Sequence, residues 1–335
     1  MQILTSQQPL HEPGGREENQ DALGSACWDS DEGPIQVFAL ADGLGGQGQG
    51  GLAARSVVDW LLGEGAVGRA LAASFLPVIN GTQRTQTTAG MQEVERSRMP
   101  ESRSAKDAEK NEVPKPLAPL GEGGDLFSQS ALGQHIEALH QGLKGLQRSA
   151  PEFERMAATL VVLLIWQDQA IWGHVGDSRL YLFRQGRLLL QTKDHSVPQM
   201  LVGEGEIGLD EIRGHPDRSR LLRALGDGHD EIRPRLQSPF ALQPGDAFLL
   251  CSDGFWEYVL EAEMESALAE AEDPDQWLRL MQQRYLLPAV ERERLAEAKE
   301  RADNDNYSAL AVWLQAEDAQ MARGVKGWLG RWFER

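Results

Sequence analysis

Hydrophobic residues in this chain fall into short continuous runs and longer stretches with helical spacing. The short runs are rich in β-branched and aromatic residues, which is typical of buried strands. Strands are predicted at 35–41, 159–166, 170–175, 179–183, 188–191, 247–252 and 307–314. Gln185 and Gly186 separate two of these runs and predict a tight turn. Apolar residues recur at helical spacing over 51–62 and 126–146, so both segments are predicted to be helices.

The segments 193–230 and 257–301 complete the pattern of a predicted α+β domain. Residues 257–301 are acidic and helical in character, with an interruption at Pro274 and a bend at Pro288. Residues 193–230 carry Gly, Pro, Asp and Arg without periodicity, which predicts an irregular flap. Many short strands with helices grouped rather than alternating favour a layered α+β fold.

Two segments differ from the rest of the chain. Residues 81–125 are polar and nearly free of large apolar side chains, so they cannot offset their ordering entropy, and we expect a disordered insertion there. Residues 319–335 are basic, and over 321–335 the aromatic residues fall on one helical face. This amphipathic tail either packs on the domain or docks on a membrane surface or a partner. A single domain is therefore expected over residues 1–318, interrupted by the insertion.

Charge and cysteine content exclude several classes of protein. Lys and Arg total 33 against 51 Asp and Glu, a net charge of −18, which repels nucleic acid. The two cysteines, Cys27 and Cys251, imply no disulfide framework, and neither has Arg six positions later, as the phosphate loop of thiol phosphatases requires. The first ten residues lack the features of a secretory signal, and no apolar run reaches the ~20 residues of a membrane span, so a cytoplasmic location is expected.

Carboxylates placed at strand ends are the sharpest chemical feature. The run 35–41 leads directly into Asp42 and Gly43, and the run 247–252 leads into Asp253 and Gly254. Such strand ends on neighbouring strands bring carboxylates together in one cleft, where divalent cations with oxygen ligands, such as Mg²⁺ or Mn²⁺, offset their charge. Asp-Gly pairs also mark ordinary turns, so each pair alone leaves both interpretations open.

Further short motifs occur in a fixed order along the chain. They are Arg16-x-x-Asn19-Gln20-Asp21, Asp42-Gly43-Leu44-Gly45-Gly46, Ala158-Thr159, Gly176-Asp177-Ser178-Arg179, Thr192-x-Asp194-His195-Ser196, Leu222-Arg223-Ala224-Leu225-Gly226, Ser252-Asp253-Gly254 and Asp305-Asn306-x-Ser308. In this order and spacing the motifs resemble those of the metal-dependent Ser/Thr protein phosphatases of type 2C, the PPM family, in their bacterial form. The resemblance extends from residue 10 to residue 315, apart from the insertion.

The resemblance implies a four-layer α-β-β-α fold with a central antiparallel β-sandwich and a metal cleft at one end. It implies that Asp42 bridges two Mn²⁺ or Mg²⁺ ions and orients a bridging hydroxide, while Asp21 and the Gly43 carbonyl contact one ion. Asp253 and Asp305 would ligate the other ion, and Asp177 would bind a possible third. Arg16 would bind the substrate phosphate, because a guanidinium binds it bidentately and stays charged.

The chain departs from the family pattern at a few positions. Gln20 replaces a common Glu, and Leu44 and Gln47 replace histidines, so no imidazole acid is evident near the metals. Asp303-Asn304 offers a second Asp-Asn pair, but Asp305 is preferred because Ser308 follows at the family spacing.

Other conspicuous residues receive structural roles. His195 is expected to be a structural histidine, Asp194 a turn-capping carboxylate and Arg179 half of an ion pair, whereas Arg223 either pairs with an acid or reaches substrate.

The resemblance therefore implies a metal-dependent protein-serine/threonine phosphatase. Its partners would be phosphoserine and phosphothreonine proteins, among them a cognate Ser/Thr kinase or that kinase's substrates in a signalling circuit. Two alternatives stay open: an inactive or regulatory phosphoprotein-binding member, and a di-metal hydrolase of a small phosphorylated molecule.

Overall fold

A computed structural model describes residues 3–28, 35–45, 48–62, 129–297, 299 and 304–316. The expected insertion at 81–125 and the expected amphipathic tail at 319–335 lie outside these ranges, as do Gly46, Gln47 and Asp303. No helix in the described ranges is long and apolar enough to cross a membrane.

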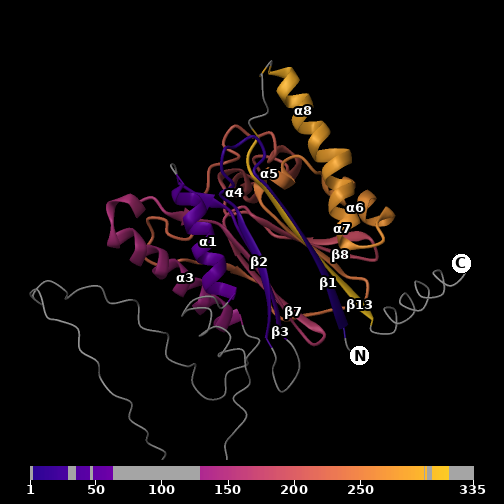
Figure 1. The fold of residues 1–335 in the computed structure, drawn as a ribbon, viewed down its shortest axis with the longest axis horizontal. Helices are drawn as coiled ribbons and strands as arrows, with labels where there is room; N and C mark the ends of the chain where they lie inside the picture. Colours follow the sequence, from indigo (N-terminus) through magenta and orange to yellow (C-terminus); the bar gives the residue numbers. More distant parts are fainter. Residues whose placement is uncertain are drawn as a thin grey trace, which may run out of the picture.

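Two antiparallel sheets face each other at the centre of the molecule (Figure 1). The first has the order β1 (Ile3–Glu12), β13 (Tyr307–Ala316), β12 (Ala247–Cys251), β8 (Arg179–Arg184) and β9 (Arg187–Gln191). The second has the order β10 (Arg235–Leu236), β7 (Gln169–Val175), β6 (Leu160–Trp166), β3 (Ile35–Ala41) and β2 (Ala22–Trp28), with β11 (Phe240–Ala241) also paired to β7. A short ribbon joins β4 (Gly43–Leu44) to β5 (Ala157–Ala158).

Helices cover the outer face of each sheet. Figure 1 shows α1 (Gln49–Leu62) and α3 (Gln129–Ser149) on one flank of the strands, and α6 (Glu261–Glu270), α7 (Pro274–Met281) and α8 (Leu287–Ala296) on the other. The short helix α5 (Asp253–Trp256) follows β12, and α4 (Val197–Glu204) follows β9. These layers confirm the expected α-β-β-α sandwich.

Side chains that alternate between the two faces of the strands contribute to three apolar cores. On β3, Val37 and Ala39 pack with α1 and α3, whereas Phe38 and Leu40 pack between the two sheets. A third core joins β8, β12 and β13 to α5–α8. Because successive strand side chains point to opposite faces, a fully apolar run can fill two cores at once. Each fully buried Leu or Phe contributes about 1.5–3 kcal/mol.

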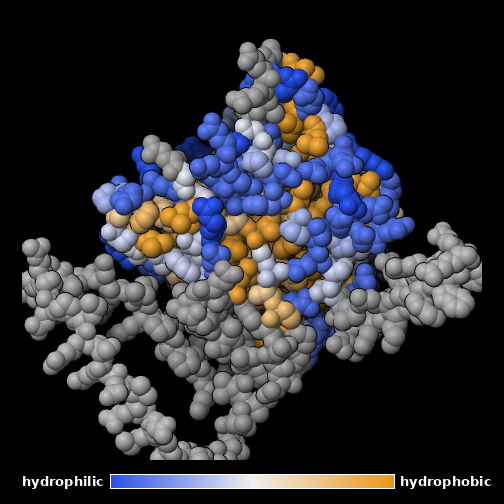
Figure 2. Space-filling model, in the orientation of Figure 1, coloured by the Kyte–Doolittle hydropathy of each residue, from blue (hydrophilic) through white to orange (hydrophobic). Residues whose placement is uncertain are grey.

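Hydrophilic and apolar residues occupy different parts of the face seen in Figure 2. Figure 2 shows hydrophilic residues across much of the described surface on this face, with apolar ones gathered over the strands between the two helical flanks. Cys251, in contrast, is fully buried in the core, as expected.

Helix boundaries follow local sequence rules. Asp273 caps α7 by accepting a hydrogen bond from the Gln276 amide at 2.7 Å, and Pro274 occupies the first turn, where no amide donor is needed. Pro288 lies at the start of α8, directly after a π-helical segment at Gln282–Leu286. Both prolines therefore mark the interruptions that the sequence predicts.

All seven predicted strands are present, whereas the short strands β4, β5, β10 and β11 were not predicted. The turn at Gln185 and Gly186 is confirmed, with φ angles of 53° and 74°. The flap is not wholly irregular, because it contains α4, whose N-terminus is capped by Ser196. The sequence reasoning missed β1, a largely polar edge strand that pairs with β13 along its whole length.

Candidate metal centre

Asp42 and Asp253 lie at the ends of strands that face each other. Asp42 follows β3 in one sheet and Asp253 follows β12 in the other. The two strands are therefore neighbours across the sandwich rather than within one sheet, and their carboxylates converge. The two sheets present their ends to the same side of the sandwich.

Antiparallel pairing brings the other aspartates to this side. Ala22 pairs with Ala41, so Asp21, just before β2, lies beside Asp42, just after β3. In the first sheet Cys251 pairs with Ala309, so the end of β12 lies beside the start of β13, which Asp305 precedes. Asp177 follows β7 in the same way. Strand ends and strand starts alternate along an antiparallel edge, which explains why widely spaced motifs meet here.

A cavity of about 480 Å³ opens at this end of the sandwich. Six predicted site residues line it: Arg16, Asp42, Gly43, Asp177, Asp253 and Asp305. The seventh, Asp21, is not among the lining residues and is only 3% exposed.

Burial and mutual repulsion disfavour the ionised form of these carboxyls. Burial raises the pKa of Asp21 to about 6 and that of Asp177 to about 7, with the charges of Asp305 and Asp194 respectively adding to the rise. Burial and neighbouring aspartates also hold the pKa of Asp42 and Asp253 well above the usual range. Groups of this kind need a counter-charge to be ionised together at neutral pH.

Close backbone contacts explain the glycines that follow two of the aspartates. A Cβ on Gly43 would lie 2.1 Å from the Gly50 carbonyl oxygen, and one on Gly254 would lie 2.2 Å from the Asn306 carbonyl oxygen. Both glycines are therefore needed for the chain to pack against itself around the cavity.

Asn306 fixes the loop that carries Arg16. Its side-chain amide donates to the carbonyls of Pro13 and Glu18 at 2.8 and 2.9 Å, and its Oδ1 accepts from the Gln20 amide at 2.8 Å. Arg16 itself donates to Asp305 Oδ2 at 3.1 Å, and both side chains are about half exposed. Arg16 is thus held at the accessible side of the cavity by a carboxylate predicted to bind metal.

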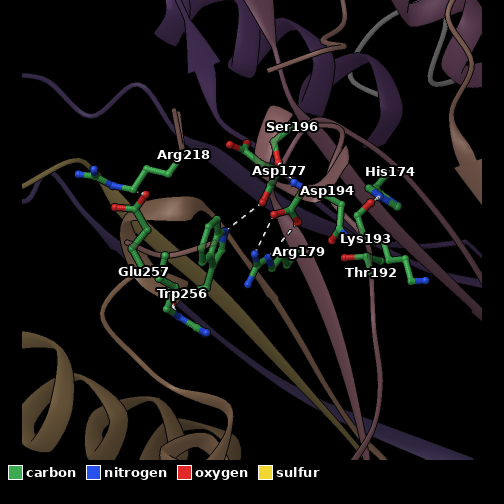
Figure 3. Close-up of polar contacts among 12 residues, drawn as sticks. His174, Asp177, Arg179, Thr192, Lys193, Asp194, Ser196, Arg218, Trp256 and Glu257 are labelled. Carbon is green, nitrogen blue, oxygen red and sulfur yellow. Dashed lines mark hydrogen bonds and ion pairs between the residues drawn. The ribbon is translucent and has the colours of Figure 1, made fainter. Parts of the chain in front are cut away.

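A buried ion pair supports the Asp177 turn (Figure 3). Arg179 donates to both carboxylate oxygens of Asp194 at 2.9 and 2.7 Å, and its guanidinium carbon lies 3.4 Å from the centre of the Trp256 ring. The Trp256 indole in turn donates to the Asp177 carbonyl at 3.0 Å. The prediction for Arg179 is confirmed, but Asp194 is its ion-pair partner rather than a turn cap.

The neighbouring histidine and the second flap arginine also have local roles. His195 is buried and its Nδ1 accepts a hydrogen bond from the Gly176 amide, as expected of a structural histidine. Arg223 forms no ion pair within the described ranges, and its charge helps to lower the pKa of His195, which burial depresses most.

The flap contributes residues that sequence reasoning left unassigned. Ser219 and Leu221 line the cavity together with the aspartates. Arg218, beside Ser219, pairs with Glu257 at 3.2 Å, and Figure 3 shows the two side chains meeting. Glu257 lies one helical turn beyond Asp253, so the flap is joined directly to the helix that begins with this aspartate. No periodic or motif signal marked these flap residues.

The donor set fits hard divalent cations. Asp21 Oδ1 is buried and has no hydrogen-bond partner among the described residues, which is costly unless a positive charge lies nearby. Carboxylate and carbonyl oxygens are the ligands that Mg²⁺ and Mn²⁺ prefer. Among the described residues, no group of three or more His, Cys, Asp or Glu side chains is already arranged to hold a metal ion. The fit therefore rests on donor chemistry, burial and charge.

Several bacterial Ser/Thr phosphatases are among the solved structures similar to this one. The catalytic domain of PstP in complex with two manganese ions aligns with a TM-score of 0.60 and 24% identity, covering 94% of this chain and all of that one. Stp1 from Staphylococcus aureus aligns with a TM-score of 0.63 and 20% identity, covering 93% of this chain and 96% of that one. At these identities the likeness shows the PPM-type phosphatase fold.

The sequence identifies the family. Residues 14–298 match Protein phosphatase 2C, and the chain belongs to this family.

Among curated relatives, PstP of Mycobacterium tuberculosis is 37% identical over 160 residues, which is 48% of this chain and 30% of that protein. The phosphatase Stp of Listeria monocytogenes is 37% identical over 138 residues, 41% of this chain and 54% of that protein. The aligned part of the chain thus spans about a third to a half of the length of these relatives.

Proposed function

We propose that this protein is a metal-dependent phosphatase of phosphoserine and phosphothreonine in proteins. The observation that carries the proposal is the convergence of four aspartates from separate strand ends at one cavity, with the buried Asp21 beside Asp42, in a chain of the Protein phosphatase 2C family. PstP and Stp are named as Ser/Thr phosphatases, and the PstP catalytic domain has been solved with two manganese ions, which supports the same assignment.

Two Mn²⁺ or Mg²⁺ ions are proposed as cofactors, with a possible third. Asp42 would contact both ions, Asp21 and the Gly43 carbonyl one of them, Asp253 and Asp305 the other, and Asp177 the third. When bound, such ions supply positive charge that activates water and offsets the charge of a phosphoryl group. Binding also favours ionisation of the buried carboxyls, whose pKa values are raised without it.

The protein's own groups would bind and orient the phosphoryl group. Arg16 lies at the half-exposed side of the cavity, where its guanidinium can exchange Asp305 for a phosphate dianion. Leu44 lines the cavity where animal relatives carry a histidine, and no histidine is among the described lining residues. Protonation of the leaving alkoxide is therefore assigned to water rather than to an imidazole.

Substitution of the ligands tests the proposal. Asp42→Asn and Asp253→Asn should each lower Mn²⁺-dependent release of phosphate from a phosphothreonine peptide by at least about 100-fold, because each removes a charge that the cations need. Asp168→Asn, at an exposed turn, is the matched control and should leave the rate within twofold. Equal rates in all three variants would contradict the ligand assignment.

The physiological setting follows from this activity. A phosphatase of this type would oppose a Ser/Thr kinase, acting on the kinase or its substrates in a cytoplasmic signalling circuit. Activity on a small phosphate ester alone, or binding of phosphopeptide without turnover, would favour the two alternatives instead.

A further inference from the structure

The two carboxylate oxygens of Asp21 have different surroundings. Oδ2 accepts a hydrogen bond from the Ser252 hydroxyl at 2.8 Å. Oδ1 is buried and has no hydrogen-bond partner within the described ranges. Because a buried carboxylate oxygen ordinarily attracts any hydroxyl in reach, something must keep the nearest donor away from Oδ1.

One hydroxyl in reach of Asp21 is that of Ser308. It lies close enough to Asp21 to lower the pKa of the carboxyl, against the larger rise caused by burial. Ser308 is fully buried on β13, directly opposite His11 on β1. Its Oγ lies 2.9 Å from Nδ1 of the His11 ring.

The direction of this hydrogen bond follows from Asn19. Asn19 Oδ1 accepts from the Asp21 amide at 3.0 Å, so its Nδ2 is the atom that faces His11 Nδ1, at 3.3 Å. An amide NH₂ only donates, which makes Nδ1 an acceptor and places the ring proton on Nε2. An unprotonated Nδ1 cannot donate, so the Ser308 hydroxyl is the donor in the shorter of the two contacts, and the two donors share the single lone pair of Nδ1. His11 is exposed as a residue, but partial desolvation of its ring lowers its pKa, which favours the neutral ring that this arrangement needs.

We propose that His11 is a positioning residue that takes the single Ser308 proton and so keeps Asp21 Oδ1 available to a divalent cation. The inference rests on the proposed function, since it assigns His11 a role toward the same cation site. A hydroxyl has one proton to donate, so donation to His11 excludes donation to Asp21. Without the imidazole acceptor, the hydroxyl would turn to Oδ1 and compete with the cation.

Mn²⁺ binding to the full chain, measured by isothermal titration calorimetry, tests the inference without reliance on turnover. His11→Phe keeps a ring of similar size but removes the acceptor, and it should weaken Mn²⁺ binding about tenfold, the cost of displacing a hydrogen bond to a carboxylate. Ser308→Ala removes the competing donor and should bind Mn²⁺ at least as tightly as wild type. The double variant should recover to within about threefold of wild type.

The recovery distinguishes positioning from a merely structural role. If His11 only supports the fold, the double variant will be as weak as His11→Phe or weaker, and the inference is overturned. Unchanged Mn²⁺ binding in His11→Phe would also overturn it. His229→Phe, at a half-exposed histidine of the flap, is the control and should bind like wild type.

Failure of the proposed function gives a different pattern. Wild-type protein that binds Mn²⁺ but releases no phosphate from phosphopeptides would refute the proposed function, while the pattern of binding across the variants would still decide the role of His11. Wild-type protein that binds no Mn²⁺ would refute both.

Discussion

Asp194→Asn is the substitution for which the structure predicts the clearest change in stability. It removes the negative charge from a pair in which Arg179 and Asp194 are only 2% and 1% exposed. The guanidinium would keep its position against the Trp256 ring but lose both charged hydrogen bonds. The change therefore leaves a buried cation without its main partner.

The expected cost is about 3 kcal/mol. Breaking a buried ion pair from one side typically costs about 3–5 kcal/mol, because the remaining charge stays desolvated. The lower end applies because Glu261 lies 3.9 Å from the same guanidinium and offers partial compensation. Arg179→Met combined with Asp194→Asn removes the stranded charge, so the double variant should recover part of the loss.

Urea unfolding followed by tryptophan fluorescence measures this cost. Asp275→Asn is the matched control, because its i,i+4 pair with Arg279 is about half exposed and should cost less than about 1 kcal/mol. A loss below about 1 kcal/mol in Asp194→Asn, or a double variant less stable than both single variants, would refute the reasoning.

Two further substitutions probe the cavity. In metal-free protein, burial raises the pKa of Asp177 to about 7, above an unfolded value near 4. The protonated Asp177 carboxyl therefore stabilises the fold below pH 4, and this contribution is lost as the pH rises to about 7. Asp177→Asn should remove this loss, and thermal unfolding at pH 5 and 8 with chelator tests it; an identical pH dependence in both proteins would contradict the assignment. Gly43→Ala places a Cβ 2.1 Å from the Gly50 oxygen and 2.6 Å from the Gln20 oxygen, so it should destabilise the fold by about 1–3 kcal/mol and weaken Mn²⁺ binding. If Gly43→Ala has the melting temperature and the Mn²⁺ affinity of the wild-type protein, the backbone around Gly43 accommodates the extra methyl group and the reasoning is contradicted.

The strongest local signals predicted the central strands well. The apolar runs at 35–41 and 247–252 became β3 and β12 because both faces of each strand are buried. The polar edge strand β1 was missed because its pairing with β13 joins residues about 300 positions apart, which no local pattern records. The same limit left the sheets of β3 and β12 unassigned, since an apolar run does not reveal which sheet it joins.

In the candidate site, too, residues in local motifs were predicted, whereas residues placed by contacts between distant segments were not. Asp21, Asp42, Asp177, Asp253 and Asp305 were found because each belongs to a short motif at a strand end. His11 and Ser308 were not assigned roles, because their contact depends on cross-strand register between distant segments. The flap residues Ser219 and Leu221 face the cavity through irregular backbone, for which hydrophobic periodicity carries no information.

Phosphate release from a phosphothreonine peptide by the wild-type protein tests the central claim most directly. The protein should be inactive after removal of divalent cations by chelation and should regain activity when Mn²⁺ is added in excess. Phosphate release that persists unchanged in chelator, or none at any Mn²⁺ concentration, would contradict the account.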